Sequence, residues 1–413
     1  MRPKVIDLFA GSGGLSLGLE QAGFEPVFVN ELNADAMSTY LLNRRSDALS
    51  SVGGHNYDIR EITAKKTSLR DFASAILAEH KEIDLVCGGP PCQGYSGIGH
   101  RRTFILDKEE IPTNHLYRDM ASVVEAIGPK MFLFENVRGL LTSRWTPSGE
   151  KGEIWADVQK AFRQIRVRKG GKRLSYTIGW KLVFAKDFGV PQNRPRVLMV
   201  GIREDIPFAQ VDSQDRGLLP DGTSAGPDLE DLLSDLVDPD WLGKSETTKY
   251  LSKPQSYIQE ALREKHLGQT FGLGDPLTEQ EYSKHSEQVI AKFQHMLDNN
   301  GELAPQMKTK KFAQRLLPAR WGANGPTITA TSLPDDYVHY SQPRVLTVRE
   351  WARLQMFPDY YQFSGKRTTG GRRRAGDPSA GDWSRDVPKY TQIGNAVPVE
   401  LARQVGLHLR KLL

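Results

Sequence analysis

The sequence predicts an α/β fold, in which a Rossmann-like sheet carries helices on both faces and a smaller irregular domain is attached. Strand-like and helical patterns alternate over the first 203 residues, as expected for βαβ units. A glycine-rich turn follows the first strand pattern, and polar side chains follow several later ones. Between residues 202 and 342 the alternation stops and prolines become frequent, which indicates a second domain.

The composition is that of an ordinary folded protein. The chain has 413 residues, of which 38% are hydrophobic and 25% charged, so it is long enough for two domains and not disordered. It has no apolar run of about 18 residues and no signal-peptide pattern, so we expect a cytoplasmic protein. Cys87 and Cys92 have no closely spaced cysteine or histidine partners, so neither a disulfide framework nor a metal site is expected.

The N-terminal segment has the pattern of a nucleotide-binding unit. Val5–Phe9 is a predicted strand, residues 10–14 form a glycine-rich turn, and residues 15–22 have helical spacing. Ser16 occupies the place where a dinucleotide fingerprint has its third glycine. This serine argues against a pyrophosphate ligand and leaves an adenosine-containing ligand open.

The next two segments offer further groups for such a ligand. Pro26–Asn30 is a predicted strand ending at Glu31, where an acid can accept hydrogen bonds from both hydroxyls of a ribose. The alternative for Glu31 is a solvated surface carboxylate. Asp58 and Ile59 are interpreted as a weaker strand end, and Asp58 could reach an adenine amine or cap the next turn. A helix is expected from Ser68 to His80.

The stretch from Asp84 to Ser96 is the centre of the predicted site. It begins as an apolar strand, stops on two glycines and two prolines, and then presents Cys92. A cysteine there lies at the carboxyl end of a buried strand, where open α/β sheets keep their chemistry; an inert thiol is the alternative. Cys87 is predicted to be core. The basic residues 97–102 could close over a nucleotide or form a solvated loop.

A second strand would bring an acid beside this thiol. Helical spacing predicts a core helix over Leu116–Ile127, and Met131–Phe134 is an apolar strand followed by Glu135 and Asn136. Parallel strands end at one sheet edge, so Cys92 and Glu135 should converge. A thiolate with an acid nearby suits nucleophilic addition to an electron-poor ring.

Basic residues follow. A helix is expected over 155–165, and the run 166–173 is a basic turn that could touch phosphates but more often is simply solvated. After a predicted strand at Tyr176–Phe184, Arg194 and Arg196 occupy alternate positions of an extended segment. They therefore point the same way and could share a pocket, with surface salt bridging as the alternative.

Six ordered motifs resemble the cytosine-5 methyltransferase family. They are DLFAGSGG, GGPPCQGYS, ENV, QNRPR, LTVREWARLQMFPD and QIGNAVP. The resemblance implies an S-adenosylmethionine-dependent enzyme with a Rossmann-like sheet. Such an enzyme transfers a methyl group to C5 of a cytosine that is flipped out of a specific sequence in double-stranded DNA.

The resemblance also implies roles for individual residues. Cys92 would attack C6 of the cytosine, Glu135 would engage N3 and the exocyclic amine, and Arg196 would lie near O2 with Arg194 supporting it. The implied cofactor-binding residues are Phe9, Gly11, Gly13, Glu31, Asp58, Ile59, Leu116, Asn395 and Ala396. The sequence departs from the family at Leu32, where many members have an aromatic side chain that stacks on adenine, and at Pro90, where some have phenylalanine.

The expected domains are a catalytic domain (1–203), a small target-recognition domain (204–388) and a C-terminal segment returning to the first (389–413). The last includes a helix over Val399–Leu412. Lys308, Lys310, Lys311, Arg315 and Arg320 are candidates for base or phosphate contacts. The basic insertion Gly365–Lys389 has seven positive residues against three acids and could track a DNA backbone or be a solvated insertion.

The leading prediction is therefore a bacterial or phage DNA (cytosine-5-)-methyltransferase of restriction-modification type. We expect a monomer associated with the nucleoid through DNA, without membrane contact, and a separately acting cognate restriction endonuclease is a candidate partner. Three alternatives are an RNA-cytosine methyltransferase, a non-catalytic DNA-binding relative and an oxidoreductase. The long 202–342 region argues against the first, the intact Cys92, Glu135 and Arg196 against the second, and Ser16 against the third.

Overall fold

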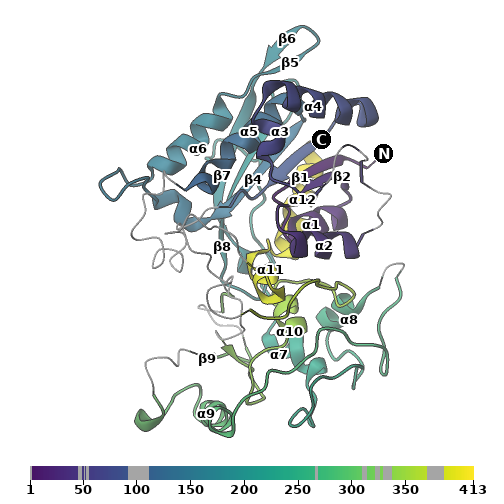
Figure 1. The fold of residues 1–413 in the computed structure, drawn as a ribbon, viewed down its shortest axis with the longest axis vertical. Coiled ribbons are helices and arrows are strands. Elements are labelled where there is room, and N and C mark those ends of the chain that lie inside the picture. The colour runs from purple at the N-terminus through teal and green to yellow at the C-terminus, as the bar shows by residue number, and fades with distance from the viewer. Residues whose placement is uncertain are drawn as a thin grey trace.

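A computed structural model describes most of the chain. The described residues are 2–44, 49–50, 52, 55–91, 111–265, 268–308, 314–320, 326–328, 337–369 and 386–413. Figure 1 shows a sheet flanked by helices in its upper half and shorter helices joined by long loops in its lower half. The predicted α/β fold is confirmed.

The main sheet is mixed, with strand order β2-β1-β3-β4-β8-β7. Its strands are β1 (Lys4–Leu8), β2 (Glu25–Asn30), β3 (Leu85–Gly88), β4 (Met131–Val137), β7 (Tyr176–Phe184) and β8 (Pro195–Arg203). Strands β2, β1, β3 and β4 are parallel, whereas β8 runs antiparallel to both β4 and β7. The carboxyl ends of the four parallel strands and of β7 therefore meet at one edge, where β8 begins.

Both faces of the sheet are covered. Alternate residues of each strand enter different cores: Val5 and Leu133 pack with helices α1 (Gly14–Gln21) and α12 (Val399–Leu412). Their neighbours on the strands pack on the opposite face, with the helices that follow β2, β3 and β4. Those helices are α4 (Lys66–His80), α5 (Leu116–Ile127) and α6 (Glu153–Arg163). The central strands are thus apolar on both faces, and only their ends are free for polar chemistry.

Several predicted helices and strands are found in the structure, and one predicted strand end is not. The predicted ranges of α5, β7 and α12 coincide with the observed ones, and β4 continues through Glu135 and Asn136. The strand end predicted at Asp58–Ile59 is wrong, because these residues lead into the short helix α3 (Arg60–Thr63). The basic run 166–173 forms the hairpin of β5 (Val167–Lys169) and β6 (Lys172–Leu174).

The lower half of the molecule contains short elements. They are α7 (Leu229–Leu233), α8 (Tyr257–Arg263), α9 (Glu287–Asp298), β9 (Arg315–Leu316), β10 (Tyr337–Val338), α10 (Val348–Arg353) and α11 (Lys389–Asn395). Buried ion pairs join them: Arg353 contacts Asp235 at 2.5 Å and Asp359 at 2.6 Å, and Arg263 contacts Asp235 at 2.6 Å. Breaking such a pair leaves an uncompensated buried charge, so these contacts fix the arrangement of the short elements.

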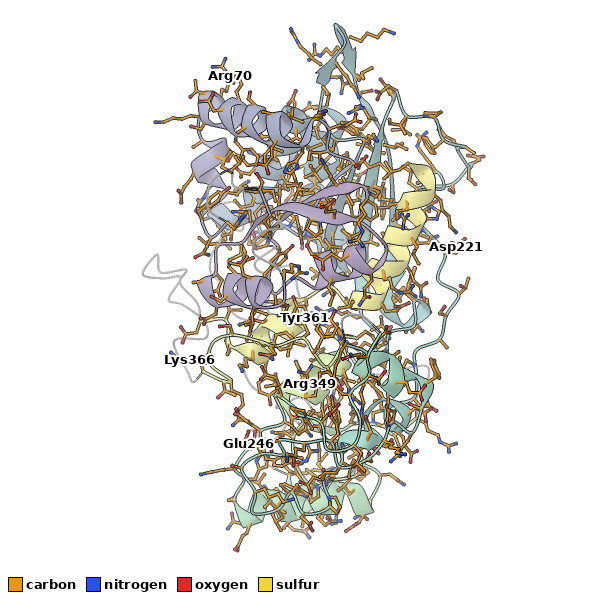
Figure 2. The ribbon with its side chains drawn as sticks, turned by 90° about the vertical axis from the view of Figure 1, so that its right-hand side faces the viewer. Arg70, Asp221, Glu246, Arg349, Tyr361 and Lys366 are labelled. Atoms are coloured by element: carbon orange, nitrogen blue, oxygen red, sulfur yellow. The ribbon has the colours of Figure 1, made fainter. Side chains whose placement is uncertain are left out.

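The two halves meet through side chains near the sheet edge. Figure 2 labels Tyr361 between the upper and lower halves and Arg349 below it. The Tyr361 hydroxyl donates to the Ser12 carbonyl at 2.6 Å, and Arg349 Nη2 donates to the Tyr361 carbonyl at 2.9 Å. The lower half is thus tied to the glycine-rich turn after β1.

The predicted division at residue 203 stays a prediction. Residues beyond position 203, namely Asp215, Gly217 and Ser224, nevertheless contact the upper half. The backbone of Asp215 lies so close to β7 that a Cβ on Gly179 would collide with it. The Gly217 carbonyl also bonds to His408 Nε2 of α12 at 2.8 Å. In the described part of the chain, no helix is both long and apolar enough to cross a membrane.

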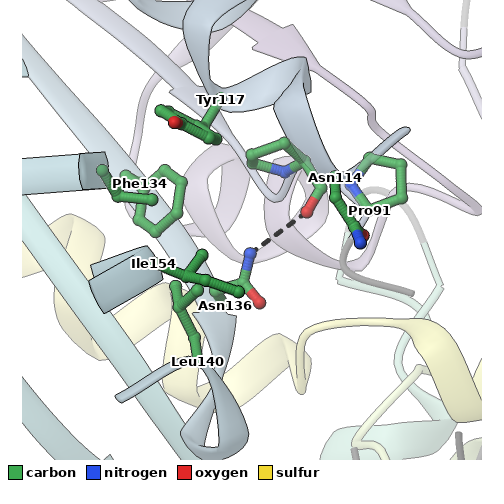
Figure 3. Close-up of a pocket in the computed structure, with 9 residues that line it drawn as sticks. Pro91, Asn114, Tyr117, Phe134, Asn136, Leu140 and Ile154 are labelled. Atoms are coloured by element: carbon green, nitrogen blue, oxygen red, sulfur yellow. Dashed lines mark hydrogen bonds between the residues drawn. The ribbon is translucent and has the colours of Figure 1, made fainter. Parts of the chain in front are cut away.

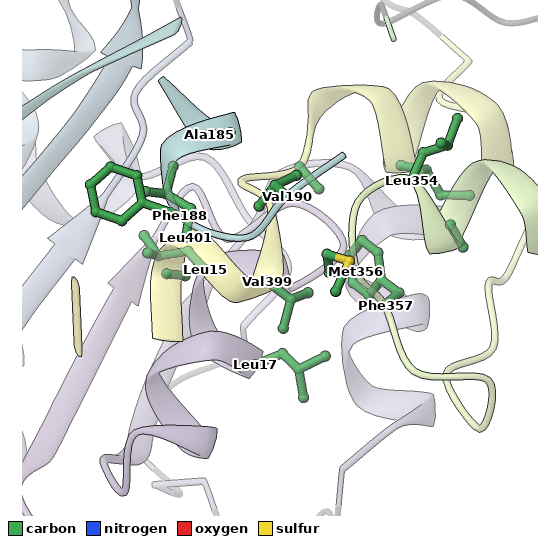
Figure 4. Packing of buried hydrophobic residues seen from close by; sticks show 14 of the residues in the cluster. Leu15, Leu17, Ala185, Phe188, Val190, Leu354, Met356, Phe357, Val399 and Leu401 are labelled. Atoms are coloured by element: carbon green, nitrogen blue, oxygen red, sulfur yellow. The ribbon is translucent and has the colours of Figure 1, made fainter. Parts of the chain in front are cut away.

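Helix α12 packs directly on α1 (Figure 4). A Cβ on Gly18 would collide with Ala402 Cβ and the Val399 carbonyl, and a Cβ on Gly406 would lie 2.7 Å from Ala22 Cβ. Leu401, Val405 and Leu409 are buried, and Leu412 is partly buried, so the predicted apolar face of this helix is confirmed. Glycines at the crossing allow the two backbones to approach closely.

Gly18→Ala should lower the free energy of unfolding by about 1–3 kcal/mol, because overpacking separates α1 from α12. Alanine is the better helix former, so intrinsic propensity alone would give the opposite sign. Gly272→Ala is the control, since a Cβ at that position would have no atom within 4 Å. Denaturant titration of both variants should show a loss only for Gly18→Ala, and equal stability of the two would contradict the packing argument.

Candidate active site

The turn after β1 is tightly folded. Phe9 has φ 59°, a left-handed conformation that is strained for a bulky side chain, and Gly11 and Gly13 have φ 57° and 85°. A Cβ on Gly13 would lie 2.8 Å from the Tyr361 hydroxyl and from a ring carbon of Tyr40. Glycine at position 13 is therefore required by the side chains packed against the turn, and glycine suits the left-handed conformation at position 11.

Glu31 lies beside this turn at the end of β2. Its Oε2 accepts from the Gly11 backbone N–H at 2.9 Å and its Oε1 from that of Asn33 at 2.7 Å. Burial raises the pKa of the Glu31 carboxyl. The side chain is partly buried and anchored to the turn, so the alternative of a solvated surface carboxylate is wrong. The adjacent Leu32 is 62% exposed.

Asp58 closes the turn that leads into the short helix α3. Its Oδ1 accepts from the Arg60 backbone N–H at 2.9 Å, and its carboxylate pairs with the Arg60 guanidinium at 2.5 Å. Hydrogen bonding from Arg60 lowers the pKa of Asp58. Of the two roles that the sequence left open, this contact corresponds to the cap on the next turn, and the adenine contact stays a prediction. Ile59 is buried, and Leu116 is buried at the start of α5.

The segment after β3 runs directly past Glu135. Gly88 pairs with Phe134 in the parallel register of β3 and β4, and a Cβ on Gly89 would lie 2.7 Å from Glu135 Oε2. The next carbonyl, of Pro90, accepts from Asn136 Nδ2 at 3.1 Å (Figure 3). Cys92 and the basic loop 97–102 lie outside the described residues. Successive side chains of β4 thus contact the segment that leads to the cysteine.

A small cavity lies beneath this segment (Figure 3). Its lining is Pro90, Pro91, Asn114, Tyr117, Phe134, Asn136, Leu140, Ile154 and Val158. Its volume of about 10 Å³ is close to the minimum for one water molecule. It is therefore too small for a nucleobase or a nucleoside.

Glu135 faces Arg196 from the neighbouring strand. Arg196 Nε lies 2.6 Å from Glu135 Oε1, and both residues are buried, at 7% and 9% exposure. The two groups form an ion pair without an aligned hydrogen bond from Nε. Surface salt bridging, the alternative role for Arg196, is therefore wrong.

Arg194 is buried near Arg196 but has different partners. Its guanidinium donates to the carbonyls of Ile328 at 2.9 Å and Gly394 at 2.5 Å, and more weakly to that of Ala396 at 3.3 Å. Burial, together with the nearby positive charge of Arg196, lowers the pKa of Arg194. The structure thus brings the two arginines together, with Arg194 serving as an anchor between chain segments.

The C-terminal segment returns to the glycine-rich turn. Ser12 Oγ donates to the Gln392 carbonyl at 3.3 Å, and a Cβ on Gly14 would collide with the Val397 carbonyl. Ala396 is buried beside this contact, whereas the Asn395 side chain is exposed. Residues from motifs 380 positions apart in the chain therefore lie together on one side of the site.

Sequence reasoning missed a buried polar network beneath the turn. Ser16 Oγ donates to Asp7 Oδ2 at 2.6 Å, the Tyr40 hydroxyl donates to Ser16 Oγ at 3.0 Å, and Cys87 Sγ donates to Asp7 Oδ1 at 3.6 Å. The serine at the fingerprint position thus forms hydrogen bonds inside the protein. An acid inside an apolar strand was the available signal for this network.

The ends of the basic insertion are paired with acids. Lys366 lies 3.6 Å from Asp386, Arg367 lies 3.3 Å from Glu281, and Lys389 lies 2.8 Å from Glu279. Residues 370–385, with the three consecutive arginines, lie outside the described part of the chain, as do Lys310 and Lys311. Lys308, Arg315 and Arg320 are exposed. A role of these groups in DNA binding stays a prediction.

Comparison with known proteins identifies relatives along the whole chain. Residues 3–411 match the family model of the C-5 cytosine-specific DNA methylase. The chain is 31% identical to the Type II methyltransferase M.XorII of Xanthomonas oryzae pv. oryzae, covering 100% of this chain and 85% of that one. It is 29% identical to the Type II methyltransferase M.DdeI of Desulfomicrobium norvegicum, covering 98% and 87%.

Solved structures have the same fold. One is described as a candidate DNA modification methyltransferase encoded within a prophage (E. coli), with a TM-score of 0.64, 24% identity and 99% coverage of both chains. Another is the methyltransferase EhMeth of Entamoeba histolytica, with a TM-score of 0.53, 15% identity and coverage of 100% and 98%.

The buried Asp7 should make stability depend on pH. Burial raises its pKa to about 6, so the folded state binds this proton more tightly than the unfolded state does. Its contribution to stability is therefore greatest below pH 4 and falls as the pH rises to 6, by up to about 3 kcal/mol. The difference in unfolding free energy between wild type and Asp7→Asn, measured from pH 4 to 7, should follow this fall. A difference that does not vary with pH would contradict it.

Proposed function

This chain belongs to the C-5 cytosine-specific DNA methylase family, and we propose that it methylates a flipped-out cytosine in a specific duplex sequence, using S-adenosylmethionine. The observation that carries this proposal is the convergence at one sheet edge of the Glu135–Arg196 pair and the segment leading to Cys92. The turn after β1 lies at the same edge, two strands from β4, and Glu31 follows the next strand, β2.

The residues beside Glu31 fit an adenosine. A carboxylate has about four acceptor positions, and backbone N–H groups use one on each oxygen of Glu31, which leaves acceptors for two ribose hydroxyls. The exposed Leu32 offers an apolar surface for an adenine, in place of the aromatic side chain common in the family. Asn56 Nδ2 fixes this position by donating to the carbonyls of Glu31 and Leu32 at 2.8 and 2.9 Å.

The remaining cofactor contacts are assigned by position. Phe9, Gly11 and Gly13 would bring the turn close to the ligand, and Asn395 and Ala396 would adjoin its methionine end. Asp58, Ile59 and Leu116 would border the adenine. When bound, S-adenosylmethionine supplies an electrophilic methyl group.

The residues that face the cytosine base, here called the base end, would activate it. C5 of cytosine is a poor nucleophile, so we assign Cys92 to attack C6 as a thiolate. Glu135, carrying a proton, donates to N3 and accepts from the exocyclic amine. Electron density then reaches C5, which takes up the methyl group. Loss of the C5 proton to a base and expulsion of the Cys92 thiolate from C6 restore the aromatic ring. Flipping the base out of the stack costs a few kcal/mol and gives access to both faces of the ring.

The Glu135–Arg196 pair would exchange partners when the base enters. Arg196 Nε and Glu135 Oε1 are close but not aligned. Once Glu135 has taken up a proton, a cytosine can provide better hydrogen bonds, with N3 and the amine facing Glu135 and O2 facing Arg196. The ion pair thus keeps both groups in place before the base arrives.

The target sequence would be read by the lower half, within residues 204–388. The two relatives named above are Type II methyltransferases, so we propose that the protein serves a restriction-modification system in the bacterial cytoplasm. It would act as a monomer on nucleoid DNA, separately from any cognate endonuclease.

Incubation with labelled S-adenosylmethionine and duplex DNA should give 5-methylcytosine at one sequence, and parallel incubation with tRNA should give none. A duplex containing 5-fluorocytosine should form a covalent complex, because the fluorine cannot leave as the proton does. Cys92→Ser should abolish the complex. Methylation of tRNA alone, or an adduct that survives in Cys92→Ser, would overturn the proposed function.

Glu135→Gln should reduce kcat by about 10²–10⁴-fold, as expected when a group that exchanges protons or hydrogen bonds with the reacting ring is lost. Glu204→Gln is the matched control, because Glu204 is exposed and bonds only to Ser175 in the described part of the chain. Steady-state kinetics on duplex DNA measures both variants. Retention of more than a tenth of wild-type kcat by Glu135→Gln would remove this residue from the mechanism.

A further inference from the structure

Gln355 is a buried glutamine just after α10, and it forms hydrogen bonds with the turn between α11 and α12. Its Nε2 donates to the carbonyls of Ile393 at 2.8 Å and Ala396 at 3.2 Å. Its own backbone carbonyl accepts from the Val399 N–H at 3.0 Å. One residue therefore holds the end of α11, the turn after it and the start of α12.

Gln192 extends this contact toward the base side of the site. Its Nε2 donates to the Leu354 carbonyl at 2.5 Å and to Gln355 Oε1 at 3.0 Å, and its Oε1 accepts from the Ile328 N–H at 3.1 Å. Both glutamines are completely buried. Because each amide uses its donors and its acceptor, neither side chain can turn over without losing hydrogen bonds.

Arg194 makes a second connection between the same segments. Arg194 donates to the Ile328 carbonyl, and Gln192 accepts from the Ile328 N–H. Both backbone groups of Ile328 are therefore hydrogen-bonded. Arg194 also donates to the Ala396 carbonyl, which receives Gln355 as well. Gln192, Arg194 and Gln355 thus form one cluster, here called the amide cluster.

The amide cluster lies between the residues that face the cytosine and those that face the cofactor. On one side, Arg194 is two residues from Arg196, which pairs with Glu135. On the other side, Ala396 packs against Gly14 at the glycine-rich turn. Hydrogen bonds have fixed directions, so this cluster sets the separation of the two sides more closely than apolar packing would.

We infer that Gln355, acting with Gln192, is a positioning residue for methyl transfer: it fixes the cofactor-side turn relative to Arg194 and, through it, to Arg196, which faces the base. This inference rests on the proposed function. A displacement of about 1 Å between reacting groups can cost about a hundredfold in rate, so loss of this cluster should act on the transfer step. It should leave the chemistry of the base end largely intact.

The test compares Gln355→Met and Gln192→Met with Gln259→Met, which removes an equally buried amide in α8. Gln259 Nε2 donates to the Asp231 carbonyl at 2.8 Å and to Ser234 Oγ at 2.9 Å, far from the amide cluster in sequence. Kinetics on duplex DNA, well below each variant's thermal midpoint, separates positioning from stability. Gln355→Met should lower kcat at least about tenfold with KM for DNA within about threefold, whereas Gln259→Met should retain kcat.

A second measurement isolates the base end. Thiolate addition at C6 lets C5 exchange its proton with water, so release of tritium from 5-tritiated cytosine without cofactor reports Cys92 and Glu135 alone. Gln355→Met should keep this exchange within about threefold of wild type. The double variant Gln192→Met/Gln355→Met should lose little more kcat than the single ones, because both remove one connected cluster.

Two results would overturn the inference. In one, Gln355→Met has the same kcat as Gln259→Met and differs from it only in thermal midpoint. Gln355 would then have a purely structural role. In the other, exchange falls as far as methyl transfer, which places the defect at the base end. Failure of the proposed function is distinguishable, since wild type itself would then not methylate duplex DNA.

Discussion

Burial of the central strands on both faces is the constraint on which the rest of the site depends. Val5 and Ile6, or Leu133 and Phe134, enter opposite cores, so neither face of β1 or β4 has room for a solvated polar group. Chemistry is confined to the edge where the strands end. There the chain changes from apolar residues to Glu31, Gly89 and Glu135 within a few positions.

That edge is completed by segments from far along the chain. The sheet supplies Glu135 and Arg196, but the turn after β1 is closed by Tyr361 and by the residues before α12. Close approach is possible because Gly14 and Gly18 have no side chain at the crossing. The C-terminal helix α12 thus packs as part of the upper half of the molecule, and the turn before it borders the candidate site.

The sequence allowed prediction where a period of apolar residues extended over many positions. Helix α5 and strand β7 had such periods and were predicted with their observed bounds. Asp58–Ile59 was too short for a period to decide, and an aspartate is equally typical of the residues just before a helix. Glu135 and Arg196 could be placed because each directly adjoins a strong strand pattern.

Other features could not be predicted from local patterns. Gln192 and Gln355 are 163 positions apart, and an uncharged amide in a loop has no periodic signal. Asp7 could be seen as an acid inside a strand, but its partners come from different elements. Contacts of this kind depend on how the elements are assembled, and the assembly is set by the sum of all packing.

The chemistry of the connections explains why polar groups are buried around the site. Apolar side chains can slide past each other at small cost, whereas a carbonyl that receives both Arg194 and Gln355 has its direction fixed. Within the described residues, the hydrogen bonds of Arg194 go to backbone carbonyls, so backbone dipoles of other chain segments stabilise its charge. A displacement of any one segment would leave part of that charge without compensation. The buried guanidinium therefore opposes movement of the base side relative to the cofactor side.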